Sequence, residues 1–70
     1  MQRTELDSTA LKGAAYCVQG GLLELDFHRG AIYRFGGVAA TTYQELLRAE
    51  SKGWYFNHHI RNRFPYIKMR

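Results

Sequence analysis

The chain has 70 residues and a formal net charge of +4, which limits it to one small domain. Its residues are 46% hydrophobic and 23% charged, a balance typical of a globular fold and not of a disordered or fibrous chain. A domain of this size has little volume in which to enclose a substrate pocket, so the length argues against an enzyme.

The cysteine and histidine content gives no disulfide and no metal site. The single cysteine, Cys17, excludes an internal disulfide bond. A zinc site made of Cys and His alone would need this cysteine together with His28, His58 and His59, at spacings that match no familiar zinc motif. Adjacent helical side chains point about 100° apart, so the last two histidines are interpreted as a surface pair. We therefore predict no metal, no cofactor and no catalytic residue, and we interpret Cys17 as a small buried apolar residue.

The N-terminal residues do not fit a targeting segment. Arg3, Glu5, Asp7 and Lys12 fall within the stretch where a signal peptide has its apolar region. Every apolar run of the chain is far shorter than the ~20 residues of a membrane helix. Together with the lone cysteine, these features predict a cytoplasmic protein with no membrane segment.

The first half of the chain is predicted to form antiparallel strands, and residues 22–28 show the clearest alternation of apolar and polar residues. The expected segments, in chain order, are residues 4–9, as a short edge strand or an extended arm, then 14–19, 22–28 and 31–36. The pair Gly20-Gly21 predicts a hairpin after the segment 14–19, and Arg29-Gly30 predicts the following turn.

The aromatic residues of the last predicted strand have two alternative roles. Tyr33 and Phe35 share one face of the strand, so both are core or both are displayed, as aromatics are on RNA-binding sheets. We favour the core, because the apolar stripes of the helices need a partner face. Arg34 then lies on the opposite face, where it would pair with Glu24 or Asp26.

The pattern then changes to a helical period. Thr41 or Thr42, followed three residues later by Gln44 or Glu45, fits a capping box at the start of a helix. Apolar residues at helical spacing follow, and this helix is expected to end near Glu50.

A second helix is expected over about residues 52–62. Ser51 is a good N-cap for it, and Pro65 keeps it from extending further. At about 100° per residue, its side chains divide into two sets. Those predicted to face the core are Phe56, Ile60 and Phe64, with Asn57 buried beside them, and those predicted to face solvent are Tyr55, His58 and Asn62.

These elements predict a single α+β domain over residues 1–70. The expected architecture is an antiparallel β-meander of three or four strands followed by two helices packed on one face. It satisfies every apolar stripe of the sequence, because the helices and one face of the sheet cover each other.

Charge and aromatic residues are concentrated at the C-terminal end. Residues 1–50 contain five basic residues and all six acidic ones, whereas residues 51–70 contain five basic residues and no acidic one. Half of the aromatic residues also lie in this last segment: Trp54, Tyr55, Phe56, Phe64 and Tyr66. Such an asymmetry indicates a surface suited to an anionic partner.

Several short motifs occur in a fixed order along the chain. They are the run Ser-Lys-Gly-x-Tyr-Phe-Asn-x-x-Ile-Arg over residues 51–61 and the segments Leu23–Phe27, Gly30–Phe35, Val38, Tyr43, Leu46–Leu47 and Pro65–Tyr66. With these motifs the chain resembles, from about Thr4 to Tyr66, the KTSC domain, a module named for its occurrence at the C-terminus of some lysyl-tRNA synthetases. The family also occurs as small free-standing proteins of bacterial and phage type.

The chain departs from the family pattern at two positions. The family's Tyr-x-Tyr corresponds to Tyr33-Arg34-Phe35 here, so the second hydroxyl is missing, and Ala39 stands where the family often has proline. The family's function is unsettled; RNA binding has been suggested for it, and a module appended to an enzyme that acts on tRNA fits that suggestion.

We therefore predict a small non-catalytic module that binds RNA or another nucleic acid through a basic, aromatic C-terminal surface. Basic side chains would neutralise phosphates, and aromatic rings would stack on bases. The predicted binding residues are Arg34, Lys52, Trp54, Tyr55, His58, Arg61, Arg63, Tyr66 and Lys68.

Other interpretations of the same surface stay open. Exposed aromatics are also typical anchors of protein contacts, so the alternative is a protein-interaction module or small regulator that docks on a larger enzyme of transcription or translation. A solvated helix face with a few core aromatics is the plainest interpretation. The expected oligomeric state is a monomer or a weak homodimer, since a small core gains stability from pairing.

Overall fold

Five strands form one antiparallel sheet, in the spatial order β1-β2-β3-β4-β5, in the computed structural model, which describes all of residues 1–70. The strands are β1 (Arg3–Glu5), β2 (Leu11–Cys17), β3 (Leu22–Phe27), β4 (Ile32–Phe35) and β5 (Tyr66–Lys68). The helical elements are a 3₁₀ turn η1 (Gln19–Gly21), α1 (Ala40–Arg48), α2 (Lys52–Tyr55) and a π-helical turn η2 (Phe56–Ile60). No helix is both long and apolar enough to cross a lipid bilayer.

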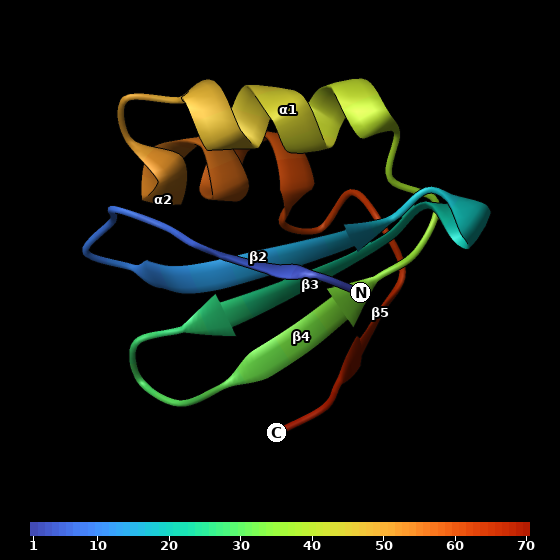
Figure 1. Cartoon of the computed structure of the whole chain (residues 1–70), viewed down its shortest axis with the longest axis horizontal. Helices are drawn as coiled ribbons and strands as arrows, with labels where there is room; N and C mark the ends of the chain where they lie inside the picture. The colour runs from blue at the N-terminus through green and yellow to red at the C-terminus, as the bar shows by residue number, and fades with distance from the viewer.

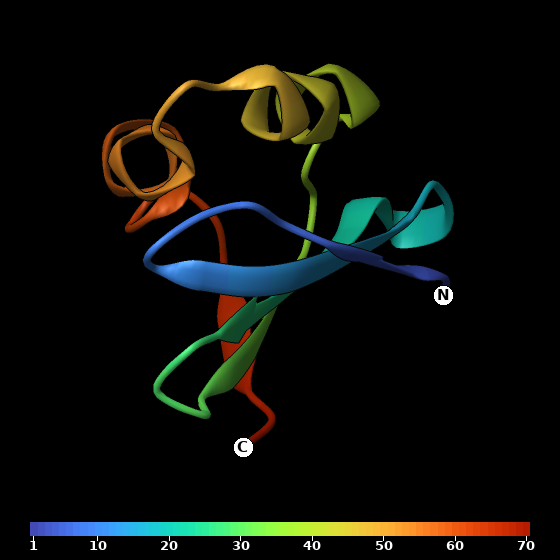
Figure 2. The same ribbon diagram turned by 60° about the vertical axis from the view of Figure 1, so that its left-hand side comes forward.

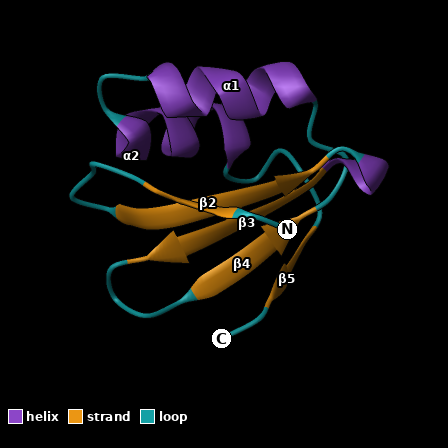
Figure 3. Cartoon of the chain, in the orientation of Figure 1, coloured by secondary structure: helices purple, strands orange, loops and turns teal.

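The helices form one layer over one face of the sheet (Figure 1). The same two layers are separated by colour in Figure 3, and Figure 2 shows that the sheet twists beneath them, so that β4 and β5 run at a steep angle to β2. The predicted α+β architecture, with helices packed on one face of an antiparallel sheet, is confirmed. The sheet has one strand more than the larger of the two predicted numbers.

The additional strand is β5, which follows the helices and closes the sheet beside β4. Its register places Tyr66 opposite Phe35 and Lys68 opposite Tyr33. All three of its residues are exposed, and a strand so short carries no usable alternation of apolar and polar residues. The strand β5 therefore forms through its pairing with β4, which the local sequence pattern does not predict.

Apolar side chains from both layers form the core. The buried residues of this cluster are Leu11, Ala14, Leu23, Leu25, Phe35, Val38, Leu46, Tyr55 and Ile60. Phe35 is a core residue, as expected, whereas Tyr33 on the same face is half-buried and packs against the margin of the core. The sequence therefore assigned both residues to the correct face of the strand.

The other face of the sheet carries one carboxylate between two arginines. The side chain of Glu24 accepts hydrogen bonds from Nη2 and Nε of Arg34 at 2.8 and 3.1 Å, and it also pairs with Arg3. The predicted cross-strand pair of Arg34 is thus formed with Glu24. Burial raises the pKa of Glu24, but the hydrogen bonds and charges of Arg34 and Arg3 outweigh this effect and leave the pKa below its usual value.

The two helices begin differently. Ser51 caps α2 as predicted, because the backbone N–H of Trp54 donates to its Oγ at 3.2 Å. The capping box predicted for α1 is wrong: the helix begins at Ala40 after the N-cap residue Ala39, and no side chain caps it. The two threonines of the predicted box therefore lie inside the first turn instead of at its entry.

The faces of the second helix differ from the prediction at two residues. Tyr55, expected in solvent, is buried, and its hydroxyl donates to Oε1 of Glu45 at 2.6 Å, because α2 packs against α1 as well as against the sheet. Asn57, expected to be buried, is exposed. The N–H of Arg61 bonds to the C=O of Phe56 in η2, and this wider turn shifts side chains away from ideal α-helical spacing.

Ionisation of Tyr55 is expected to destabilise the fold at alkaline pH. Burial, together with the hydrogen bond to Glu45 and its charge, raises the pKa of Tyr55 to about 12, above the ordinary ~10. Because the pKa is higher in the folded state, the stabilisation is complete below about pH 10 and is lost as the pH rises towards 12.

Urea unfolding between pH 9 and pH 11.5 measures this effect. The free energy of unfolding should fall over that interval, and its difference from that of Tyr55→Phe should shrink, because the variant has no hydroxyl to ionise. A difference that stays constant from pH 9 to pH 11.5 would contradict the prediction.

Candidate functional site

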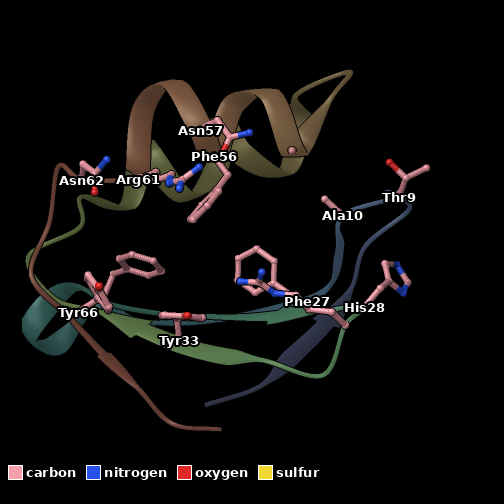
Figure 4. Close-up of a pocket in the computed structure, with 13 residues that line it drawn as sticks. Thr9, Ala10, Phe27, His28, Tyr33, Phe56, Asn57, Arg61, Asn62 and Tyr66 are labelled. Atoms are coloured by element: carbon pink, nitrogen blue, oxygen red, sulfur yellow. The ribbon is translucent and has the colours of Figure 1, made fainter.

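A groove opens between η2 and the half of the sheet formed by β3, β4 and β5. Its volume is about 620 Å³, and its aromatic lining residues are Phe27, Tyr33, Phe35, Phe56 and Tyr66. Figure 4 shows Phe56 projecting from the helical layer towards the sheet, with Arg61 beside it in that layer and Phe27, Tyr33 and Tyr66 on the sheet below. We call this concave surface the aromatic groove.

The pleat of the strands explains why these rings meet. Alternate residues of a strand share a face, so Tyr33 and Phe35 both point towards the helices, and Tyr66 lies opposite Phe35 on β5. The ring centroids of Tyr33 and Tyr66 are 5.5 Å apart, and those of Phe35 and Tyr66 are 5.8 Å apart. Phe56 meets Phe27 at 5.3 Å and Phe35 at 5.8 Å in T-shaped contacts. Tyr66 is nevertheless 56% exposed, so its ring is accessible to a ligand.

Polar side chains surround the aromatic groove. They come from the helical layer and from the turn between β3 and β4, and they include Asn57, Arg61, Asn62, His28 and Arg29. The guanidinium carbon of Arg29 lies 5.4 Å from the ring centroid of Phe27, a distance suited to a cation–π contact. The turn is tied to the N-terminal segment, because Nε2 of His28 lies 2.8 Å from the carbonyl oxygen of Ser8.

A second, smaller pocket adjoins the aromatic groove. It has a volume of about 420 Å³ and is lined by Arg29, Gly30, Ala31, Tyr33, Lys68 and Arg70, so Arg29 and Tyr33 line both cavities. We call it the three-cation pocket, after Arg29, Lys68 and Arg70. The C-terminus is held at this place because the N–H groups of Met69 and Arg70 donate to the carbonyl oxygen of Ile32 at 2.7 and 3.2 Å.

The cations around these two cavities are not engaged by carboxylates. Both ion pairs of the structure belong to Glu24, which binds Arg3 and Arg34 on the opposite face of the sheet. The basic residues that keep an unpaired charge here are Arg29, Arg61, Lys68 and Arg70. A concave surface lined by one sign of charge focuses its field and attracts anions.

Three of the predicted binding residues belong to this surface. Arg61 and Tyr66 line the aromatic groove, and Lys68 lines the three-cation pocket. Sequence reasoning missed Arg29 and Arg70 as their partners. The first was placed in a turn and the second at the chain end, and only the pairing of β5 with β4 brings them together.

Three other predicted residues are engaged elsewhere. Arg34 is paired with Glu24 on the far face of the sheet, and Tyr55 is buried. The Nζ of Lys52 donates to the carbonyl oxygen of Ala49 at 3.0 Å, across the start of α2. We therefore remove Arg34 and Tyr55 from the candidate surface, because neither side chain can reach a ligand in the groove.

The remaining predicted residues are exposed but line neither cavity. Trp54 and His58 stack on each other with ring centroids 3.8 Å apart, and Nδ1 of His58 lies 2.8 Å from the carbonyl oxygen of Trp54. Arg63 is exposed in the turn after η2. The expected single basic and aromatic surface is thus divided between the groove and the outer side of the second helix.

Comparisons with known proteins agree with this fold. Residues 7–64 match the model of the KTSC domain family. A relative from Stutzerimonas stutzeri (strain A1501), named only as an uncharacterized protein, is 39% identical over 57 residues, which cover 81% of this chain and 80% of the relative. The crystal structure of a KTSC domain protein from Yersinia pestis superposes with a TM-score of 0.91 and 28% identity, over 99% of this chain and 97% of the other.

Proposed function

The chain belongs to the KTSC domain family, and we propose that it is a non-catalytic module that binds single-stranded RNA through the aromatic groove and the adjoining three-cation pocket. One observation carries the proposal: accessible aromatic rings and unpaired cations converge on one concave surface. Nucleic acid is the ligand that offers both a flat apolar base and a repeated anion to such a surface.

The proposal assigns separate roles to the two kinds of side chain. Tyr66 and Tyr33 stack on unpaired bases, each contact contributing about 1–3 kcal/mol. Arg61 and the cations of the three-cation pocket neutralise backbone phosphates, so that binding weakens as salt increases. Only an unstacked, unpaired base can enter the groove, so the domain binds single-stranded RNA in preference to a duplex. The proposed setting is the cytoplasm.

Titration of a fluorescently labelled single-stranded oligoribonucleotide with the full chain, followed by anisotropy, tests the proposal. Binding is expected at 50 mM salt. It should weaken roughly 50-fold at 200 mM salt if about four phosphates are contacted, since the slope is about −0.7 per contact for single strands. A duplex of the same sequence is the control and should bind more weakly. Absence of binding to the single strand at 50 mM salt would overturn the proposal.

A protein-interaction role is the second candidate, and the exposed Trp54 favours it. This side chain is 56% exposed and is held by stacking on His58, as a preorganised anchor of a protein contact would be. A complex with a larger enzyme of transcription or translation should survive nuclease treatment and moderate salt, and Trp54→Ala should abolish it. Loss of the complex on nuclease treatment would contradict this role.

The proposed module is a monomer or a weak homodimer. Sedimentation over a wide range of protein concentration distinguishes the two states, because a weak dimer shows a mass that rises with concentration. A constant monomer mass would exclude self-association.

A further inference from the structure

The aromatic groove and the three-cation pocket are parts of one continuous surface. Arg29 and Tyr33 line both, and Tyr33 stands opposite Lys68 in the register of β4 and β5. A molecule with its apolar part on Tyr33 and Tyr66 would therefore have its other end among the three cations. The surface thus offers an aromatic subsite and a cationic subsite that are directly adjacent.

The side chains around the three-cation pocket are suited to an anion. None of its lining residues has an acidic side chain, so a bound anion would be attracted by the like charges of the Arg29, Lys68 and Arg70 side chains. A side chain built at Gly30, which lies at this pocket, would meet nothing within 4 Å, and the φ of this glycine is +98°. The backbone of the turn is therefore open to close approach, as at many sites that bind phosphate.

We propose that the two subsites together bind one unstacked nucleotide, with its base in the aromatic groove and its phosphate in the three-cation pocket. This inference rests on the proposed function and adds the unit that is recognised. Arg29 lines both subsites and contacts the ring of Phe27. Its guanidinium would therefore lie at the part of the nucleotide that joins the base to the phosphate. The domain then holds the strand at one flipped-out nucleotide, whose phosphate is one of those that the basic side chains contact.

Amide resonances of isotope-labelled protein distinguish the two subsites. Gly30 and Ala31 report on the three-cation pocket, and Gly53 and Asn57 report on the aromatic groove. Titration with AMP should shift both pairs of resonances. Inorganic phosphate should shift only the first pair and adenosine only the second, each binding roughly fivefold or more weakly than AMP.

Charge-matched variants test the assignment of the phosphate. Arg70→Ala should weaken AMP binding roughly fivefold, the effect of losing one charge-assisted contact at a partly exposed site. Arg48→Ala removes the same charge from the exposed end of α1, outside both cavities, and should change the affinity less than twofold. The same pair of variants is measured with the single-stranded oligoribonucleotide.

The outcomes separate this inference from the proposed function. If the oligoribonucleotide binds but AMP shifts neither pair of resonances, or if Arg70→Ala and Arg48→Ala have equal effects, the nucleotide assignment is overturned and RNA binding stands. If neither the oligoribonucleotide nor AMP binds at 50 mM salt, both are overturned. Shifts of both pairs by AMP, reduced by Arg70→Ala alone, support the assignment.

Discussion

Replacing Gly21 by alanine is expected to leave most of the domain unfolded at 25 °C. The φ of this residue is +58°, a backbone conformation that residues with a side chain rarely adopt. An added Cβ would lie 2.6 Å from the oxygen and 2.8 Å from the nitrogen of Val38. Both are backbone atoms, so neither can move away as the end of a flexible side chain would.

The contact at Gly21 joins two distant parts of the chain. The N–H of Val38 donates to the carbonyl oxygen of Gly21 at 2.9 Å, and the N–H of Gly37 donates to that of Gly20 at 3.1 Å. The hydroxyl of Tyr16 adds a bond to the carbonyl oxygen of Val38 at 2.6 Å. Separating these two segments would break the hydrogen bonds that hold the residues before α1 against the turn between β2 and β3. We expect a loss of about 3 kcal/mol or more, which is comparable to the whole stability of so small a domain.

Gly37→Ala is the matched control. Gly37 has a φ of +74°, but a Cβ built on it would meet nothing within 4 Å. It therefore carries the cost of the left-handed conformation, about 1–2 kcal/mol, without the collision. Urea unfolding followed by circular dichroism should show a folded Gly37→Ala and a largely unfolded Gly21→Ala. Equal midpoints for the two variants would show that the close approach to Val38 contributes nothing.

The Gly20-Gly21 pair illustrates how far the sequence predicts this fold. A turn at that point follows from local preference, and the strand after it follows from its alternation. The strand before it was expected over residues 14–19, but β2 begins at Leu11 and ends at Cys17. The packing of the turn against Val38 does not follow, because the two segments are brought together only by the complete fold. The ion pair of Arg34 and Glu24 was predictable, because both residues lie in strands joined by a short turn. The strand β5 was not predictable, because it is brought beside β4 only by the complete fold.

The candidate site was less predictable from the sequence than the fold, because it depends more on contacts between distant segments. Arg61, Tyr66 and Lys68 were found because charge and aromatic residues are dense in the last segment of the chain. Arg29 and Arg70 complete the surface, but their proximity depends on β5, which has no local signal. Charge density in a sequence therefore indicates that a basic surface exists, and tertiary structure decides which of its residues face a common ligand.

Replacing Tyr66 by alanine is expected to weaken binding of single-stranded RNA roughly tenfold. Its ring lines the aromatic groove, 5.5 Å from that of Tyr33. Replacing an aromatic side chain on which a base stacks by alanine costs about 1–3 kcal/mol of binding free energy. Because Tyr66 is 56% exposed, its loss should leave the fold intact, which circular dichroism verifies. Tyr66→Phe retains the ring and should bind within twofold of the unchanged chain.

Trp54→Ala is the decisive comparison, because Trp54 is also 56% exposed and was predicted from the same sequence segment. It lines neither cavity, so its removal should change RNA affinity less than twofold. If Trp54→Ala weakens binding and Tyr66→Ala does not, the RNA lies along the outer side of the second helix and the groove has another ligand. If Tyr66→Ala alone weakens binding, stacking in the groove accounts for the affinity, because the two variants remove aromatic rings of equal exposure from different surfaces.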